Sequence, residues 1–247
     1  AARGSDCHIL LVGDRARVEP LLEESGASNE NLTVHHATEV VAMDAHPVEA
    51  VRRQKDSSIV VATRLVKEGA ADALVSAGST GAAMATSLLQ WGRIRGIERP
   101  AIGTVLPTLS GVCILLDVGA QVDSRSSHLT QFALMGNLYA QRVLGVARPK
   151  VALLSNGEEE TKGSDLVRET YGRLKEIADL NFIGNIEGRD ILPGKADVVV
   201  CDGFVGNAVL KASEGLARML VARVQQTFEA HWGSRLVGLL ARPALRR

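Results

Sequence analysis

The sequence has few cysteines, few aromatic residues and no long apolar run, and each shortage excludes a class of protein. Its 247 residues include three cysteines, Cys7, Cys113 and Cys201, with no CxxC pair, so neither a disulfide framework nor a zinc site is predicted. Aromatic residues make up 3%, too few for a nucleic-acid surface of stacked rings. No apolar stretch approaches the ~20 residues that span a bilayer, and no signal peptide is recognisable, so we expect a cytoplasmic protein.

Charge balances over the whole chain but not along it. The 28 basic and 28 acidic residues give a formal net charge of zero. Between residues 211 and 247, however, seven basic residues stand against two acidic ones. A basic tail on a mildly acidic body predicts contact with an acidic partner or an anionic surface.

Short apolar segments alternate with longer segments of helical periodicity. Strands are predicted at residues 8–12, 32–36, 72–76, 101–106, 112–118, 150–154, 180–183 and 197–201. Helices are predicted at residues 47–68, 80–93, 126–144, 164–178 and 204–229, with a further short one at 235–241. Most strands are apolar on both faces, which is typical of a mainly parallel sheet covered by helices on each side. We therefore expect a single α/β domain over residues 1–247, a three-layer αβα fold whose residues 204–242 form a C-terminal helical extension.

Glycine-containing clusters follow five of the predicted strands. They occupy residues 76–82, 117–123, 155–164, 184–190 and 202–207. Loops at the carboxyl ends of parallel strands share one edge of a sheet, where ligands bind, and glycine lets backbone N–H groups approach an anion closely. For any single loop, the alternative is that glycine only makes a tight turn. Five such loops, each with polar side chains, favour an anion site.

The common signatures of cofactor and metal sites are missing. Residues 157–164 read GEEETKGS, which departs from the nucleotide P-loop by exchanging the lysine and the last glycine. We find neither GxGxxG nor GxSxG after any strand, and the six histidines do not have zinc-ligand spacing. These absences favour an enzyme that uses no metal, no dinucleotide and no activated serine.

Taken together, these loops resemble the bacterial phosphate acyltransferases of phospholipid synthesis, the PlsX family. The resemblance rests on residues 42–58, 77–82, 115–120, 131–136, 157–163 and 181–190, and most strongly on DVVVCDGFVGN at 197–207 followed by Lys211. It implies a phosphotransacetylase/isocitrate-dehydrogenase-like fold and a homodimer. Compared with the family, the chain is expected to lack the usual first strand and the glycine-rich last motif. Ser79 departs from the family's usual Asn, and Ser155-Asn156 departs from its usual Asn-Ile.

The activity implied by the resemblance is transfer of a fatty acyl group from acyl carrier protein to inorganic phosphate, without a cofactor. Two alternatives remain open: a phosphotransacetylase-like enzyme that uses acyl-coenzyme A, and a non-catalytic fragment that binds the carrier or a membrane. Direct attack by phosphate needs a cation, positioned donors and stabilisation of the carbonyl oxygen. The expected catalytic residues are Lys162, Asp202, Asn207 and Asp117, and the expected phosphate-binding residues are Gly78, Ser79, Thr80, Gly81, Gly203, Gly206 and Lys211.

Each of these assignments has a structural alternative. Lys162 follows three acidic residues and would then be a solvated ion-pair partner, while Asp202 would be a helix cap and Asn207 a cap or turn residue. Cys201 is expected to pack inertly in its strand.

The basic tail has two expected uses. The periodic residues Val209, Leu216, Leu220, Val224 and Phe228 predict a helix that packs on its own domain or on a partner subunit. The following segment would contact an anionic membrane or the acidic carrier protein through Arg235, Leu236, Leu239, Leu240 and Arg242. We therefore expect a cytoplasmic enzyme that associates peripherally with the cell membrane.

Overall fold

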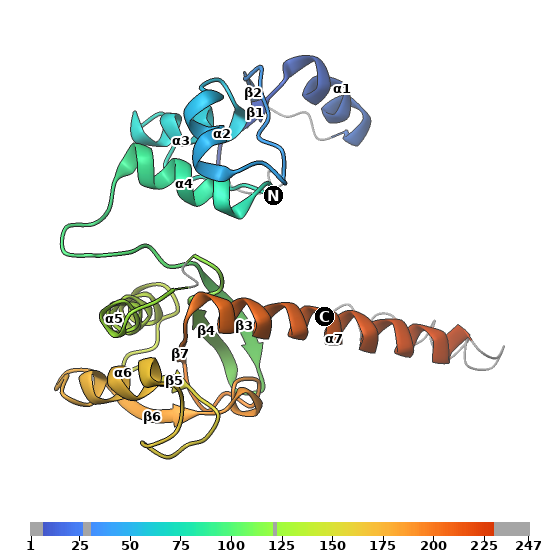
Figure 1. Cartoon of the computed structure of the whole chain (residues 1–247). Helices are drawn as coiled ribbons and strands as arrows, with labels where there is room; N and C mark the ends of the chain where they lie inside the picture. Colours follow the sequence, from blue (N-terminus) through green and yellow to red (C-terminus); the bar gives the residue numbers. More distant parts are fainter. Residues whose placement is uncertain (1–6, 27–30, 121–122, 230–247) are drawn as a thin grey trace. The chain divides into compact units, whose positions relative to one another are not determined.

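The computed structural model describes residues 7–26, 31–120 and 123–229. They form two compact units, one within residues 1–100 and one within residues 101–247 (Figure 1). Each unit is described by itself. That the whole chain acts as one α/β domain stays a prediction.

Unit 1 combines a small parallel sheet with a group of helices. Its elements are β1 (Ile9–Gly13), α1 (Arg15–Ser25), β2 (Leu32–His36), α2 (Pro47–Arg53), α3 (Ser58–Lys67) and α4 (Thr80–Trp91). Helix α1, which the sequence did not predict, begins at the N-cap Asp14 and ends at Gly26, whose φ of 60° is readily adopted by glycine. Helices α2, α3 and α4 enclose a small core of Val51, Ile59, Val60, Ala82 and Ala85.

Two sequence predictions in unit 1 are wrong, for the same kind of reason. The helix predicted over residues 47–68 is interrupted at 54–57 because the backbone there pairs with Glu39: Glu39 N donates to Asp56 O at 3.2 Å and Ser58 N to Glu39 O at 3.0 Å. The strand predicted at residues 72–76 is not a strand. Among the described residues, its backbone has no backbone hydrogen-bond partner, and Val75 is 96% exposed. Local propensity is therefore overridden by backbone pairing at residues 54–57 and by the lack of a pairing partner at residues 72–76.

Unit 2 is built on a five-stranded sheet in the order β3-β4-β7-β5-β6. The strands are β3 (Gly103–Thr108), β4 (Gly111–Leu116), β5 (Val151–Leu154), β6 (Phe182–Ile186) and β7 (Val198–Val200). Every pair is parallel except the β3–β4 hairpin. The prediction of an α/β fold with a mainly parallel sheet is confirmed.

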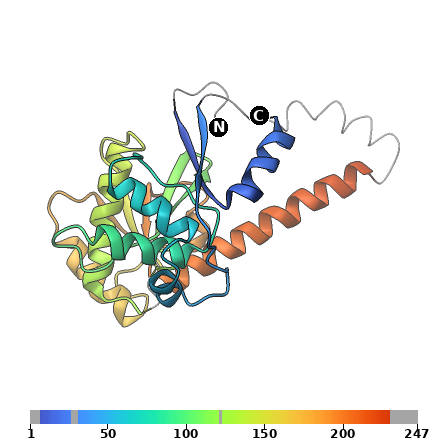
Figure 2. The ribbon, with the colours of Figure 1, turned by 90° about the horizontal axis from the view of Figure 1, so that it is seen from above.

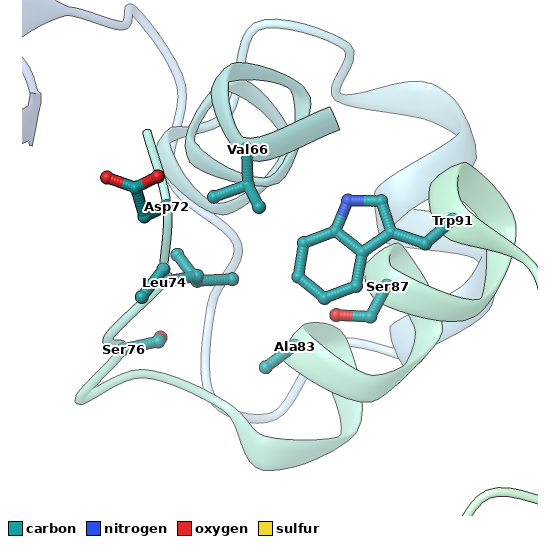
Figure 3. A pocket seen from close by; sticks show the side chains of 8 residues that line it. Val66, Asp72, Leu74, Ser76, Ala83, Ser87 and Trp91 are labelled. Atoms are coloured by element: carbon teal, nitrogen blue, oxygen red, sulfur yellow. The ribbon is translucent and has the colours of Figure 1, made fainter. Parts of the chain in front are cut away.

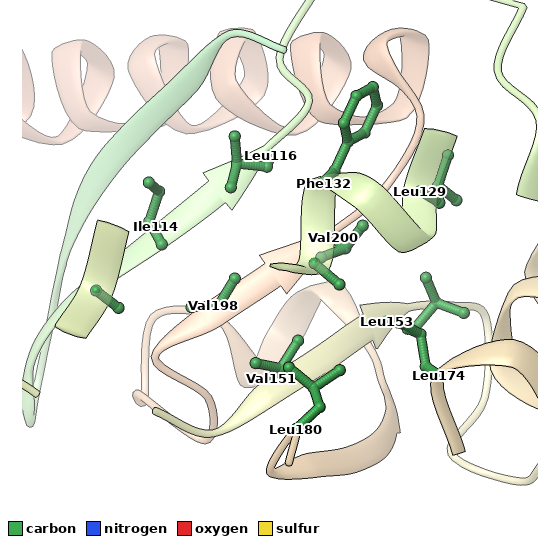
Figure 4. Packing of buried hydrophobic residues seen from close by; sticks show 12 residues of the cluster. Ile114, Leu116, Leu129, Phe132, Val151, Leu153, Leu174, Leu180, Val198 and Val200 are labelled. Atoms are coloured by element: carbon green, nitrogen blue, oxygen red, sulfur yellow. The ribbon is translucent and has the colours of Figure 1, made fainter. Parts of the chain in front are cut away.

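Helices cover both faces of this sheet. They are α5 (Ser126–Arg142), α6 (Asp165–Lys175) and α7 (Gly203–Glu229), with a short 3-10 helix, η1 (Gly188–Asp190). One face packs on α5 and α6 through a cluster that includes Leu116, Phe132, Val151, Leu174 and Val198 (Figure 4). The other face packs on the first turns of α7, where Val209 and Leu210 join a second cluster.

Helix α7 leaves this core as it continues. Figures 1 and 2 both show its later turns extending away from the sheet of unit 2. Leu216, Leu220 and Val224 are 50%, 52% and 47% exposed within the described residues. The helix predicted at residues 204–229 is thus present, but only its beginning packs on its own unit. In the part of the chain that the structure describes, no helix has the length and apolar character needed to cross a membrane.

Candidate functional site

The predicted site residues of unit 2 gather at one edge of its sheet. Strands β4, β7, β5 and β6 run parallel, so their carboxyl ends lie at the same edge. Asp117 follows β4, Asp202 follows β7, and Lys162 lies in the loop after β5. Four of the five loops predicted to share one edge thus follow strands of this sheet, whereas the loop at residues 76–82 lies in unit 1 after a segment that is not a strand.

The ends of β4 and β7 are joined more tightly than the sequence indicates. Beyond the strands, Cys201 N donates to Leu116 O at 2.6 Å and Asp117 N donates to Cys201 O at 3.0 Å. Gly206, in the first turn of α7, lies directly against this junction. A Cβ at position 206 would lie 1.9 Å from the carbonyl oxygen of Asp117 and 2.9 Å from the sulfur of Cys201. The beginning of α7 reaches the β4 loop this closely because residue 206 has no side chain.

Asp117 is buried and orients the loop that follows it. One carboxylate oxygen accepts hydrogen bonds from the backbone N–H groups of Ile102 at 3.0 Å, Gly119 at 3.2 Å and Ala120 at 3.0 Å. A carboxylate bound in this way fixes the turn after β4. Of the two roles predicted for Asp117, orienting or accepting a proton, this geometry fits the first.

Asp202 is the N-cap of α7. Its Oδ1 accepts from the backbone N–H groups of Phe204 and Val205, both at 3.0 Å. The alternative role weighed for Asp202, as a helix cap, is therefore present in the structure. Gly203 is buried at this turn, and the positive end of the α7 dipole lies at the same edge of the sheet.

Asn207 and Lys211 lie on successive turns of α7. Asn207 is exposed, and its Cβ lies 4.0 Å from the position that a Cβ on Gly119 would take, so it adjoins the β4 loop. Lys211 forms an ion pair with Glu214 on its own helix at 3.1 Å. Asn207 therefore lies beside the turn that follows β4. Lys211 has a carboxylate partner on its own helix instead of a free ammonium for phosphate.

Within residues 7–26, 31–120 and 123–229, Lys162 has no ion-pair partner, although three acidic residues precede it. Glu158 pairs with Lys195 at 2.8 Å and Glu160 pairs with Lys175 at 3.1 Å. Among the described residues, no carboxylate lies within ion-pair distance of the Lys162 ammonium. The aliphatic stem of Lys162 packs over Gly157, where a Cβ would meet Lys162 Cγ at 2.7 Å. The alternative weighed for Lys162, a salt bridge to its acidic neighbours, is not what the structure shows.

Three residues that sequence reasoning missed support this loop. Lys175 and Lys195 pair with two of its three acids, Glu160 and Glu158, and buried Asn185 donates from Nδ2 to the carbonyl oxygen of Glu159 at 2.9 Å. Asn185 could have been noticed in the sequence because it is a polar residue inside an otherwise apolar strand. The two lysines carry no comparable signal, because ordinary exposed lysines look the same in a sequence.

The remaining predicted phosphate contacts lie in unit 1. Ser79 is the N-cap of α4, where its Oγ accepts from Ala82 N at 3.3 Å, and Thr80 is the first residue of that helix. Gly78 N donates to Ser76 Oγ at 3.2 Å. Gly81 allows α4 to approach α2, since a Cβ there would meet Pro47 Cγ at 2.8 Å. Capping and packing thus account for the local shape of this loop.

Unit 1 also has a depression of about 520 Å³ that includes none of the predicted site residues (Figure 3). Leu74 and Val66 line it together with the ring of Trp91, whose N–H donates to Thr63 O at 3.1 Å. Asp72, Ser76 and Ser87 supply its polar groups.

The cysteines of unit 2 are not poised for nucleophilic chemistry. Burial raises the pKa of the Cys113 thiol to about 12, and burial, followed by the nearby carboxylates of Asp202 and Asp117, raises the pKa of Cys201. A thiol must ionise to attack a carbonyl. Cys201 therefore packs inertly, as expected. In the described part of the chain, no group of three or more His, Cys, Asp or Glu side chains is placed to hold a metal ion.

The residues expected to contact a membrane or the carrier protein fall outside the described residues. They are Arg235, Leu236, Leu239, Leu240 and Arg242, together with the short helix predicted at 235–241. Their assignments stay predictions.

Comparison with known structures identifies the fold. EutD phosphotransacetylase from Staphylococcus aureus aligns with a TM-score of 0.58 at 21% sequence identity, covering 84% of this chain and 74% of that one. The phosphotransacetylase-like fold expected from the resemblance is thereby confirmed.

Comparison with known sequences identifies the family. The family model described as "Fatty acid synthesis protein" matches residues 1–247. The phosphate acyltransferase of Heliobacterium modesticaldum is 57% identical over 247 residues, covering 100% of this chain and 73% of its own length. That of Desulfitobacterium hafniense is 56% identical over 242 residues, covering 98% and 72%. The chain therefore belongs to the phosphate acyltransferase family of enzymes.

Proposed function

We propose that this enzyme transfers a fatty acyl group from the thioester of acyl carrier protein to inorganic phosphate, producing an acyl phosphate for phospholipid synthesis. Family membership supports the reaction class. The structural observation that supports it best is the unpaired ammonium of Lys162, at the same sheet edge as the beginning of α7. A cation and a helix N-terminus together favour a bound dianion.

The reaction needs no external acid or base. A phosphate oxygen attacks the carbonyl carbon of the thioester, a C–O bond forms, and the C–S bond breaks as the carrier's thiolate leaves. The proton carried by hydrogen phosphate ends on that thiolate, giving a neutral thiol and an acyl phosphate dianion. The protein's contribution is then to position phosphate and to stabilise the negative carbonyl oxygen.

Within this proposal, Lys162 and the positive end of the α7 dipole at Gly203 bind phosphate. The N–H groups of Phe204, Val205 and Gly206 are already donated to Asp202. Asn207 supplies a side-chain donor, while Asp117 and Asp202 hold their two loops in place. The assignment of Gly78, Ser79, Thr80 and Gly81, in unit 1, to phosphate binding stays a prediction. The buried thiols of Cys113 and Cys201 favour direct attack over an acyl-enzyme, because neither ionises readily.

Replacing Lys162 tests the assignment. We expect Lys162→Met to raise the KM for phosphate by about tenfold or more, since a charge-assisted contact contributes roughly 1.5–3 kcal/mol. The assay is phosphate-dependent release of thiol from acyl carrier protein thioesters. Lys150→Met, at the amino end of β5 rather than the carboxyl end, is the matched control and should behave as wild type. An unchanged KM in Lys162→Met would remove Lys162 from the site.

The same assay with acyl-coenzyme A separates the two enzymatic alternatives. Faster thiol release from coenzyme A than from the carrier would favour the phosphotransacetylase-like activity. Rapid quenching without phosphate tests the direct route: an acyl group left covalently on the protein would contradict it.

We further propose a homodimer that associates peripherally with anionic membranes in the cytoplasm. The exposed apolar side chains Leu216, Leu220 and Val224 of α7 support a helical contact with a second copy. Sedimentation equilibrium tests the dimer, and a monomer at micromolar concentration would exclude it. Co-sedimentation with anionic vesicles tests the membrane contact, which Leu239→Glu with Leu240→Glu should abolish. The same arginine-flanked segment is proposed to dock acyl carrier protein.

A further inference from the structure

The acidic side chains before Lys162 are held by lysines from other elements. Lys195, between η1 and β7, contacts Glu158 at 2.8 Å and Asp190 at 3.7 Å. Lys175, the last residue of α6, contacts Glu160 at 3.1 Å. The hydrogen bonds to these carboxylates raise the pKa of both lysines. Two of the three carboxylates nearest to Lys162 in sequence are therefore already paired.

The loop backbone is fixed at separate points. Lys162 N donates to Glu159 O at 3.0 Å, and Asn185 Nδ2 donates to the same oxygen at 2.9 Å. Gly163 N donates to Asn156 Oδ1 at 2.9 Å, and the Arg168 guanidinium donates to Gly163 O at 2.7 Å. These bonds hold the backbone on both sides of Lys162. The loop backbone thus has supports other than the ion pairs of Glu158 and Glu160.

We infer that Lys195 is a positioning residue for phosphate binding, because it holds the carboxylate of Glu158 and so keeps Lys162 available to the anion. Without Lys195, Glu158 has no cationic partner and becomes an intramolecular competitor of phosphate for Lys162. Lys175 does the same for Glu160. This inference rests on the proposed function, in which Lys162 is the phosphate-binding cation.

The size of the effect follows from the exposure of the pair. The side chains of Lys195 and Glu158 are 39% and 54% exposed. Exposed ion pairs are weak, so competition by one of them should lower phosphate affinity by about fivefold. A loss of this size is measurable by calorimetric titration of the full chain with inorganic phosphate, which does not depend on turnover.

A set of variants separates charge competition from a structural role. Lys195→Gln should weaken phosphate binding by about fivefold. Glu158→Gln alone should bind like wild type, and Lys195→Gln combined with Glu158→Gln should restore the affinity, because the competitor is gone. Lys195→Arg retains the ion pair and should also bind normally. Arg15→Gln, which removes an exposed ion pair of 2.9 Å on α1, is the matched control.

The outcomes distinguish the inference from the proposed function. If Lys162→Met loses phosphate binding but Lys195→Gln does not, Lys195 has no positioning role and the proposed function stands. If the double variant binds as weakly as Lys195→Gln, the role of Lys195 is structural and the inference is wrong. If Lys162→Met binds phosphate like wild type, both fail. Should Lys195→Gln not fold, Lys175→Gln with and without Glu160→Gln decides by the same pattern.

Discussion

The two units differ in how deeply their parallel strands are buried. In unit 2, all residues of β5 and β7 are buried, between α5 and α6 on one face and α7 on the other. In unit 1, β1 and β2 pair only with each other among the described strands, and most of their residues are half-buried or exposed. The sequences ILLVG of β1 and VALL of β5 are equally apolar. Burial therefore depends on neighbouring strands and helices as much as on the strand's own residues.

The largest expected difference between the units concerns two tightly packed glycines. In unit 2, Gly206→Ala should lower the free energy of unfolding by about 4 kcal/mol or more, since the alanine Cβ would lie 1.9 Å from the backbone oxygen of Asp117. In unit 1, Gly81→Ala should cost only about 1 kcal/mol, because the obstructing atom at 2.8 Å belongs to the Pro47 ring. The free energies of unfolding of both variants can be measured by urea denaturation monitored by circular dichroism.

Gly215→Ala supplies the control for this comparison. It lies on the same helix as Gly206, and a Cβ there would meet nothing within 4 Å. Alanine should stabilise the helix at that position by up to about 1 kcal/mol. Equal costs at positions 206 and 81 would show that the contact at Asp117 relaxes easily.

Truncating one strand leucine in each unit gives a smaller but more direct comparison. Leu153 on β5 is 0% exposed, so Leu153→Ala should destabilise by about 3 kcal/mol. Leu11 on β1 is only half-buried, and Leu11→Ala should cost about 1 kcal/mol. The free energies of unfolding from urea titration provide the test, and an equal loss at both sites would contradict the contrast in burial.

The smallest expected effects concern acid stability, where the units should be alike. Hydrogen bonds from Thr38 lower the pKa of Asp56 in unit 1, and hydrogen bonds from Ser126 and then Arg173 lower the pKa of Glu169 in unit 2. A carboxylate with a lowered pKa stabilises the folded state above its unfolded pKa, 3.8 for Asp56 and 4.5 for Glu169, and this contribution disappears as the pH falls through the folded value.

Asp56→Asn and Glu169→Gln should therefore be less stable than wild type near pH 7 and should match it at strongly acidic pH. Urea midpoints measured across this range provide the comparison. A stability difference that persists unchanged at the lowest pH would mean that charge is not its origin.

Local sequence predicted most of unit 2 because its buried strands are uniformly apolar and its helices have clear periodicity. The strand at residues 197–201 and the helix at 204–229 were both found within a few residues of their observed bounds. The failures occurred where backbone pairing decides the outcome: residues 54–57 bridge to Glu39, and residues 72–76 find no backbone partner in the part of the chain that the structure describes. No sequence pattern encodes either fact.

The site could be predicted in its location but not in its electrostatics. Glycine loops after strands located Lys162, Asp117 and Asp202 at one edge. Which lysine remains unpaired depends on Lys175 and Lys195, which approach the loop from other elements. The capping role of Asp202 was weighed in advance, whereas the burial of the Asp117 carboxylate against three N–H groups requires the folded turn.

The close contact between Gly206 and Asp117 also limits when the site can form. The neighbouring hydrogen bond from the thiol of Cys201 to the carbonyl oxygen of Asp117 joins positions 84 residues apart. Strand β7 lies between β4 and β5, although it is the last of the five strands to be synthesised. A growing polypeptide therefore leaves a gap in the middle of the sheet until residues 198–206 have been made. Since β7 fills the middle of the sheet, this edge cannot be assembled during translation before residues 198–206 have left the ribosome.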